Sequence, residues 1–72
     1  MKEVMAGVLE IDPAALREGI QREDVPSWSS INHLRMVSSL EEELGIRFTM
    51  KEVGEMESFA AVRRLVVEKL RT

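Results

Sequence analysis

The chain has 72 residues, which is enough for one small domain over residues 1–72. A domain of this size buries only about 60% of its unfolded surface, so we expect no large enclosed active site. Its net charge of −3 at pH 7 gives no reason to expect nucleic acid as a partner, because nucleic acid phosphates require a basic surface. The absence of cysteine excludes disulfides and thiolate metal sites, so any thiol chemistry requires a thiol supplied by a cofactor.

The N-terminal segment predicts a helix over residues 1–9, followed by a helical turn. Four apolar residues share one face of that helix, namely Val4, Met5, Val8 and Leu9. Asp12 and Pro13 predict the turn, with the aspartate as its cap and the proline at its first position. Glu3 comes early and no long apolar run follows it, so we expect neither a signal peptide nor a membrane span and predict a cytoplasmic protein.

A long irregular connection is predicted over residues 17–29. The helical periodicity is interrupted there by Gly19, Asp24, Pro26 and Ser27. We expect the connection to lie over the core through its apolar side chains, which are Ile20, Val25 and Trp28. Loops of this length without regular structure are uncommon unless they have a function, and this one leads to two serines that are candidate site residues.

Residues 30–44 predict an amphipathic helix that begins beside two serines. Its apolar stripe, which we expect to face the core, consists of Ile31, Leu34, Val37, Leu40 and Leu44. Gly45 supplies a left-handed stop. Ser29 can cap the helix through its side-chain oxygen and leave the Ser30 hydroxyl free on the first turn. A phosphodiester on that hydroxyl lies near the positive end of the helix dipole.

Two further helices are predicted in the last third of the chain. Residues 46–48 form a short extended apolar link, after which Thr49 caps a brief helix with Glu52 as its capping-box partner. Ser58 starts a last helix over residues 59–70, whose stripe consists of Phe59, Val62, Leu65, Val66, Lys69 and Leu70. The predicted fold class is all-α, a small four-helix bundle with three longer helices, one short helix and a long first loop.

Residues 29–31 read Ser-Ser-Ile, and residues 40–46 read Leu-Glu-Glu-Glu-Leu-Gly-Ile. These two stretches resemble the acyl carrier protein family, including its peptidyl carrier relatives. The family pattern is Asp-Ser-Leu followed by a helix that ends in a Leu-Glu-Glu-Glu-Phe-Gly-like stretch. The resemblance extends over essentially all 72 residues. Trp28 and the stretch Asn-His-Leu at residues 32–34 look most similar to small freestanding carriers of specialised biosynthetic clusters.

The resemblance implies that Ser30 carries a covalent 4′-phosphopantetheine arm added by a phosphopantetheinyl transferase. The arm holds an acyl or aminoacyl group as a thioester, which acyl-loading and acyl-accepting enzymes exchange, as in fatty acid or polyketide biosynthesis. Ser29 stands where the family has an aspartate that helps place magnesium, which implies slower modification or a dedicated transferase. We expect a monomer that is not an enzyme, because the chain has no constellation of acid, base and nucleophile.

The resemblance also implies a face on the helix after Ser30 that docks to partner enzymes. Its expected members are Ile31, His33, Arg35, Ser38, Glu42 and Glu43. Arg35 stands where carriers often have an acid, so we expect it to reject partners built for a uniformly acidic helix. His33 lies off the apolar stripe and is expected to be exposed as a surface contact near the arm. As the only histidine in a chain without cysteine, it is not expected to bind a metal.

Several of these features have simpler interpretations. Ser30 can be merely part of a helix cap, and a run of glutamates is often only a solvated face. The three aromatic residues are expected to be core or core-edge residues, namely Trp28, Phe48 and Phe59. Met36, Met50 and Met56 either pack in the core or line an adaptable cleft for an acyl chain. The alternative function is a helical interaction module that has a carrier-like fold and is never modified.

Overall fold

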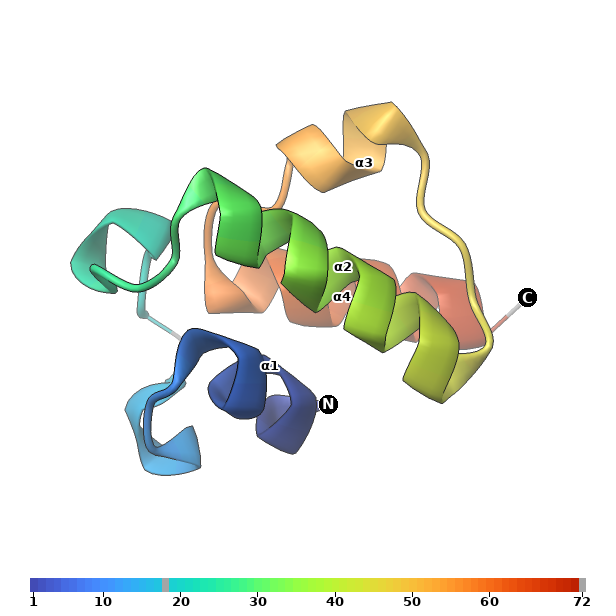
Figure 1. Ribbon diagram of the computed structural model, residues 1–72. Helices are drawn as coiled ribbons and strands as arrows, with labels where there is room; N and C mark the ends of the chain where they lie inside the picture. The colour runs from blue at the N-terminus through green and yellow to red at the C-terminus, as the bar shows by residue number, and fades with distance from the viewer. Residues whose placement is uncertain (18, 72) are drawn as a thin grey trace.

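The computed structural model describes residues 1–17 and 19–71. Within these residues it has four α-helices, which are α1 Lys2–Leu9, α2 Ser30–Leu44, α3 Met50–Gly54 and α4 Phe59–Leu70 (Figure 1). Two turns of 3-10 helix, Pro13–Ala15 and Arg22–Asp24, lie in the connection between α1 and α2. The predicted all-α fold with three longer helices and one short helix is confirmed. None of the described helices is both long and apolar enough to cross a membrane.

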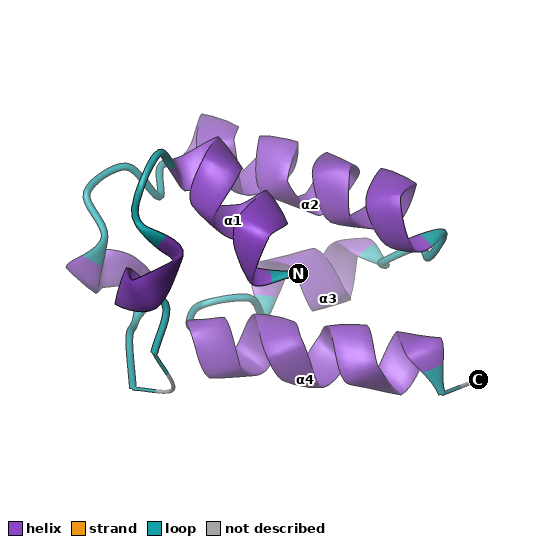
Figure 2. Ribbon diagram, turned by 90° about the horizontal axis from the view of Figure 1, so that it is seen from below, coloured by secondary structure: helices purple, strands orange, loops and turns teal. Residues whose placement is uncertain are grey.

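The longest helix, α2, lies at the centre of the arrangement. It runs antiparallel to α1, and α1 and α3 lie on opposite flanks of it (Figures 1 and 2). α4 runs along a further side of α2 (Figures 1 and 2), and buried residues of the three longer helices form one core cluster. The connection from α1 gathers at the end of the molecule where α2 begins. The first turn of α2 is therefore bordered by this connection and by the end of α1.

The helix boundaries follow the capping residues that the sequence predicts. Ser29, Thr49 and Ser58 each accept a hydrogen bond through the side-chain oxygen from the backbone N–H three residues later. Asp12 accepts a hydrogen bond through its Oδ1 from the Ala14 N–H and caps the first 3-10 turn. Gly45 ends α2 with a φ of 65°, which glycine adopts without the clash that a Cβ atom causes. The predicted helix starts and the predicted stop are confirmed.

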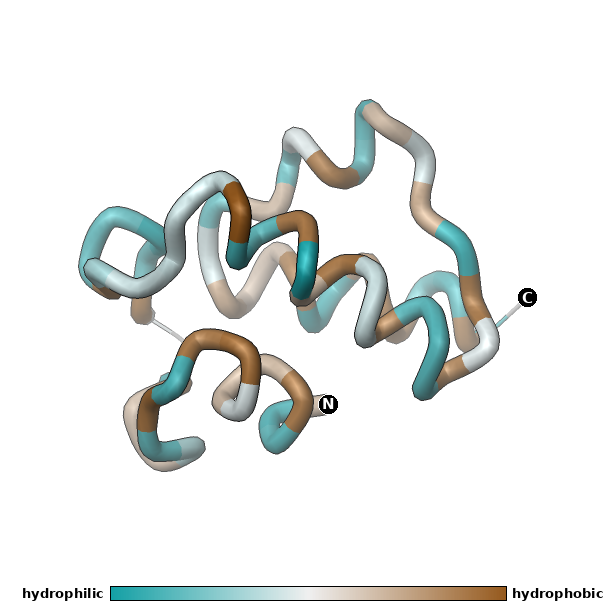
Figure 3. Tube along the Cα trace, viewed as in Figure 1, coloured by the Kyte–Doolittle hydropathy of each residue, from teal (hydrophilic) through white to brown (hydrophobic). Residues whose placement is uncertain are grey.

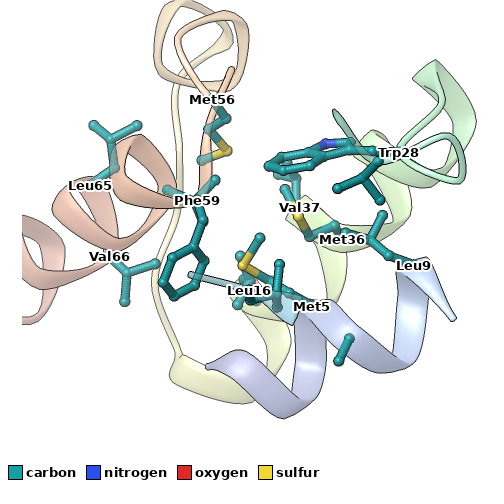
Figure 4. Packing of buried hydrophobic residues seen from close by; sticks show 14 residues of the cluster. Met5, Leu9, Leu16, Trp28, Met36, Val37, Met56, Phe59, Leu65 and Val66 are labelled. Carbon is teal, nitrogen blue, oxygen red and sulfur yellow. The ribbon is translucent and has the colours of Figure 1, made fainter. Parts of the chain in front are cut away.

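The core lies between the three longer helices and is closed by the α1–α2 connection (Figure 4). Its buried apolar residues are Met5, Ala6, Leu9, Leu16, Val25, Trp28, Met36, Val37, Leu40, Met56, Phe59, Val62, Leu65 and Val66. Trp28 and Phe59 belong to this cluster and Phe48 packs against it, so the core role predicted for the aromatic residues is confirmed. Met36 and Met56 are fully buried packing residues, whereas Met50 is exposed.

The buried face of α2 differs from the predicted stripe. Val37 and Leu40 are buried as predicted, but Ile31 is 67% and Leu34 59% exposed, so the assignment of these two residues to the core face is wrong. The buried residues of α2 are His33, Met36, Val37 and Leu40. The buried face is turned toward His33 because α3 and the loop before α2 pack on that flank. Figure 3 shows how apolar and hydrophilic segments alternate along α2, which is why periodicity alone places this face imprecisely.

The long connection is fastened to the start of α4. Gln21 and Ser58 form an isolated antiparallel bridge, and the Arg22 N–H donates to the Glu57 carbonyl at 2.8 Å. Farther along, Val25 and Trp28 are buried, which confirms the expectation that this connection lies over the core. The loop that leads into α2 is thus held by α4 as well as by its own turns.

Glu52 fastens α3 to its own first turn and to α4. Its Oε1 accepts a hydrogen bond from the Thr49 N–H at 2.8 Å and lies 2.9 Å from the Nζ of Lys69. The Thr49 N–H first, and then the Lys69 ammonium, lower the pKa of the Glu52 carboxyl below its ordinary value, because both stabilise the charged form. This contact is important because a five-residue helix is too short to be stable alone.

Candidate functional site at the start of α2

The two serines at the start of α2 have the separate positions that the sequence predicts. The Ser29 Oγ accepts a hydrogen bond from the Asn32 N–H at 3.2 Å and is the N-cap. Ser30 is the first residue of α2 and is exposed, and its hydroxyl makes no hydrogen bond within the described part of the chain. A hydroxyl without a structural role is open to modification, and a phosphodiester there lies at the positive end of a 15-residue helix.

A buried hydrogen-bond chain lies one turn below Ser30. The Trp28 Nε1–H donates to the His33 Nδ1 at 2.9 Å, and the His33 Nε2 lies 2.8 Å from the Val53 carbonyl oxygen of α3. Because an indole N–H can only donate, the Nδ1 must accept and the Nε2 must carry the hydrogen that it donates to Val53. His33 therefore ties the loop before α2 and the helix α3 to the first turns of α2.

His33 is only 5% exposed, so the prediction that it is a surface contact is wrong. Its burial is compensated by the two hydrogen bonds, which satisfy both ring nitrogens. The sequence holds a weak signal for this pairing, since Trp28 and His33 are five residues apart across a helix start and each has a polar ring nitrogen. No group of three or more histidine, aspartate or glutamate side chains that could hold a metal ion occurs among residues 1–17 and 19–71.

Four of the predicted docking residues lie on one exposed stripe of α2. Ile31, Arg35, Ser38 and Glu42 follow one another at helical spacings of four, three and four residues, and all are exposed. Within the described residues Arg35 forms no ion pair, so its charge is available to a partner. Glu43 is also exposed, one residue beyond the stripe. The stripe therefore changes from an apolar and basic end near Ser30 to an acidic end.

The structure gives two residues near this stripe roles that the sequence did not predict. Leu34 is exposed one turn after Ser30 and adds to the apolar surface of Ile31. Glu41, by contrast, has a structural role, because its Oε2 accepts a hydrogen bond from the Phe48 N–H at 2.8 Å and so holds the link that leads to α3. A large apolar residue outside the buried face suggests a contact surface. For Leu34 this signal can be recognised only once the buried face of α2 is known.

No protein-family model matches the sequence, and no curated protein matches it. Among solved structures, the chain is similar to the solution NMR structure of the holo acyl carrier protein from Geobacter metallireducens, with a TM-score of 0.87 and 24% sequence identity. The match covers 97% of this chain and 80% of that chain. The chain has the acyl carrier protein fold. At this identity the likeness establishes the fold, and function rests on the site.

Proposed function

We propose that the protein is an acyl carrier, with a 4′-phosphopantetheine arm on Ser30 that holds an acyl or aminoacyl group as a thioester. The observation that supports this proposal is the exposed Ser30 hydroxyl, free of any structural hydrogen bond, at the first position of α2 in an acyl carrier protein fold. The carrier delivers the group between biosynthetic enzymes and does not itself turn over a substrate.

The residues around Ser30 fit such a group. Because Ser29 provides the cap, modification of Ser30 removes no hydrogen bond from the helix. The negative phosphodiester is favoured at a helix N-terminus by about 0.3–1 kcal/mol. The arm supplies a thiol, which the chain lacks because it has no cysteine. The chain in turn supplies a rigid attachment point, since the Trp28–His33 hydrogen bond and the contact of His33 with Val53 of α3 hold the first turns of α2 in place.

Partner enzymes would dock on the exposed stripe of α2. Ile31 and Leu34 offer apolar contact beside Ser30, while Arg35 and Glu42 place opposite charges on the same face. Opposite charges on one face make an encounter depend on a matching pattern in the partner. We assign Ser38 to this surface and Glu43 to its edge, and we leave out the buried His33. The partners are a phosphopantetheinyl transferase and the enzymes that load and accept the acyl group, and we place this monomeric carrier in the cytoplasm.

The test is arm attachment to Ser30. Incubation with coenzyme A and a phosphopantetheinyl transferase should increase the intact mass by one arm, and Ser30→Ala should abolish the increase. Ser27→Ala is the control, because this serine lies in the loop just before α2 and its buried hydroxyl makes no hydrogen bond within the described residues, so that it should not accept the arm. An arm that maps to another serine, or persists in Ser30→Ala, contradicts the assignment. If no transferase from the native host modifies the wild type, the unmodified interaction module becomes the better interpretation.

A further inference from the structure

An open groove lies between α1 and α2, with a volume of about 650 Å³. Gly7, Val8 and Glu10 line it from the α1 side, and the α2 side includes Leu34, Arg35 and Ser38. This volume is within the range of small-molecule sites, roughly 300–1,000 Å³. Ser30 does not line the groove, but the α2 residues that do follow it by two to nine positions, or by about 3–14 Å along the helix axis, so the groove is within reach of a long arm on Ser30.

We propose that this groove is the resting site of the chain's own pantetheine arm. The inference rests on the proposed function. A tethered group needs little intrinsic affinity for a nearby site, because the tether gives it an effective concentration on the order of millimolar. A shallow open groove is therefore sufficient for an arm on Ser30, whereas it would hold a free small molecule only weakly.

The chemistry of the two walls matches the chemistry of the arm. Pantetheine has two amide groups, a hydroxyl group and a geminal dimethyl group. Arg35 and Ser38 can donate to amide oxygens, and the Glu10 carboxylate can accept from the amide N–H groups. Val8 and Leu34 offer apolar surface to the methyl groups.

The other flank of α2 is less suited to the arm. His33 is buried there and its Nε2 donates to the Val53 carbonyl at 2.8 Å, which joins α2 directly to α3. Met36 and Met56 of the core cluster are fully buried and offer the arm no surface. An arm that entered between α2 and α3 would have to break this partly buried hydrogen bond, whereas the α1 side offers an open groove.

The test uses the arm-bearing protein with a nitroxide label on the arm thiol. Paramagnetic broadening of the backbone amides should be stronger at Gly7 and Ser38 than at Val53 and Gly54, which lie on the other flank. Gly7→Leu should remove this asymmetry by filling the groove, and it should fold because a Cβ at Gly7 meets no atom within 4 Å. Gly54→Leu is the matched control, since a Cβ there also meets nothing within 4 Å, and it should leave the asymmetry unchanged.

Accessibility of the unlabelled thiol provides a second measurement. Alkylation of the wild-type arm should be slower than that of Gly7→Leu by about two- to fivefold, if roughly half to four-fifths of the arms are docked. Equal broadening of both flanks, stronger broadening at α3, or an asymmetry that survives Gly7→Leu would overturn the groove as the resting site while leaving the carrier function intact. Failure of arm attachment to Ser30 would overturn the proposed function and this site together.

Discussion

Ser29 and Ser30 are neighbours of identical chemistry, and their positions relative to the first turn of α2 give them different roles. Ser29 lies outside the helix with extended backbone, so its oxygen can reach the Asn32 N–H. Ser30 already has helical backbone, and its side chain points to solvent. Which of the two serines is free for modification therefore depends on a difference of one position in the sequence.

Ser29→Asp should speed attachment of the arm by a broad-range transferase. In the family that this chain resembles, an aspartate at this position helps place magnesium, and a carboxylate is the oxygen ligand that magnesium prefers. The fold should keep its stability within about 0.5 kcal/mol, because aspartate caps as well as serine and its charge suits the helix N-terminus. The measurement is the initial rate of mass increase beside a urea unfolding curve, and equal rates for the two proteins would contradict the prediction.

The Trp28–His33 pair should show energetic coupling. His33→Phe leaves the Trp28 N–H and the Val53 carbonyl without partners and should cost about 2–4 kcal/mol of unfolding free energy. Trp28→Phe should also destabilise. The double variant should be less destabilised than the sum of the single variants by about 0.5–3 kcal/mol. Urea unfolding followed by far-ultraviolet circular dichroism measures all four proteins, and strictly additive losses would mean that the pair contributes no bond energy.

At the scale of elements, α3 shows how contacts can maintain a helix that its length does not support. It has five residues and none of them is fully buried. Its position is set by the Thr49–Glu52 capping box, by the ion pair with Lys69 of α4 and by the His33 bond to Val53. The capping box fixes the first turn of α3 itself, whereas the other two contacts join α3 to α4 and to α2, so its orientation depends on both of them.

The charge of Glu52 should make part of this stability depend on pH. Its pKa is lowered in the folded state, so its contribution is fully present above the pKa of the unfolded chain and is lost as the pH falls through the folded value. Wild type should exceed Glu52→Gln in unfolding free energy near pH 6, and the difference should shrink as the pH falls below about 4, the ordinary range of the glutamate pKa. Unfolding curves at several pH values test this, with Glu55→Gln as control. A difference independent of pH would contradict the assignment.

At the scale of the whole molecule, the surface around Ser30 combines an apolar and basic end with an acidic end on one helix. The fold places this stripe on the outside of α2, because the core, α3 and α1 occupy the other sides. The net charge of −3 describes this surface poorly, since Arg35 lies beside the proposed arm and the acids lie farther along. Partner choice is therefore expected to depend on pattern more than on total charge.

Arg35→Glu should weaken transfer to the native partner and improve acceptance by enzymes adapted to uniformly acidic carriers. A misplaced like charge in an interface can cost several kcal/mol, so both changes should be visible in kcat/KM. The effects should fade between low and moderate salt, because exposed charges are screened. Arg64→Glu on α4 is the matched control, being exposed and remote from α2 in sequence. Unchanged rates with both classes of enzyme would leave Arg35 a solvated residue.

The sequence by itself determined the number, type and limits of the helices, together with the position of Ser30. These are local properties, because caps such as Ser29 and Ser58 and a stop such as Gly45 act within one turn of the chain. The resemblance in residues 29–31 and 40–46 added the expectation of a carrier, and the fold agrees with it.

Only the tertiary structure decided which face of α2 is buried and what His33 does. A helical period fits the stripe of Ile31, Leu34, Val37 and Leu40. It fits equally well the stripe through His33 that is buried in the structure. An imidazole can be buried once both of its nitrogens have hydrogen-bond partners. Those partners, Trp28 and Val53, come from a loop and from another helix. A period in one helix cannot encode which neighbours will pack against it, and the groove beside α1 depends on the same packing.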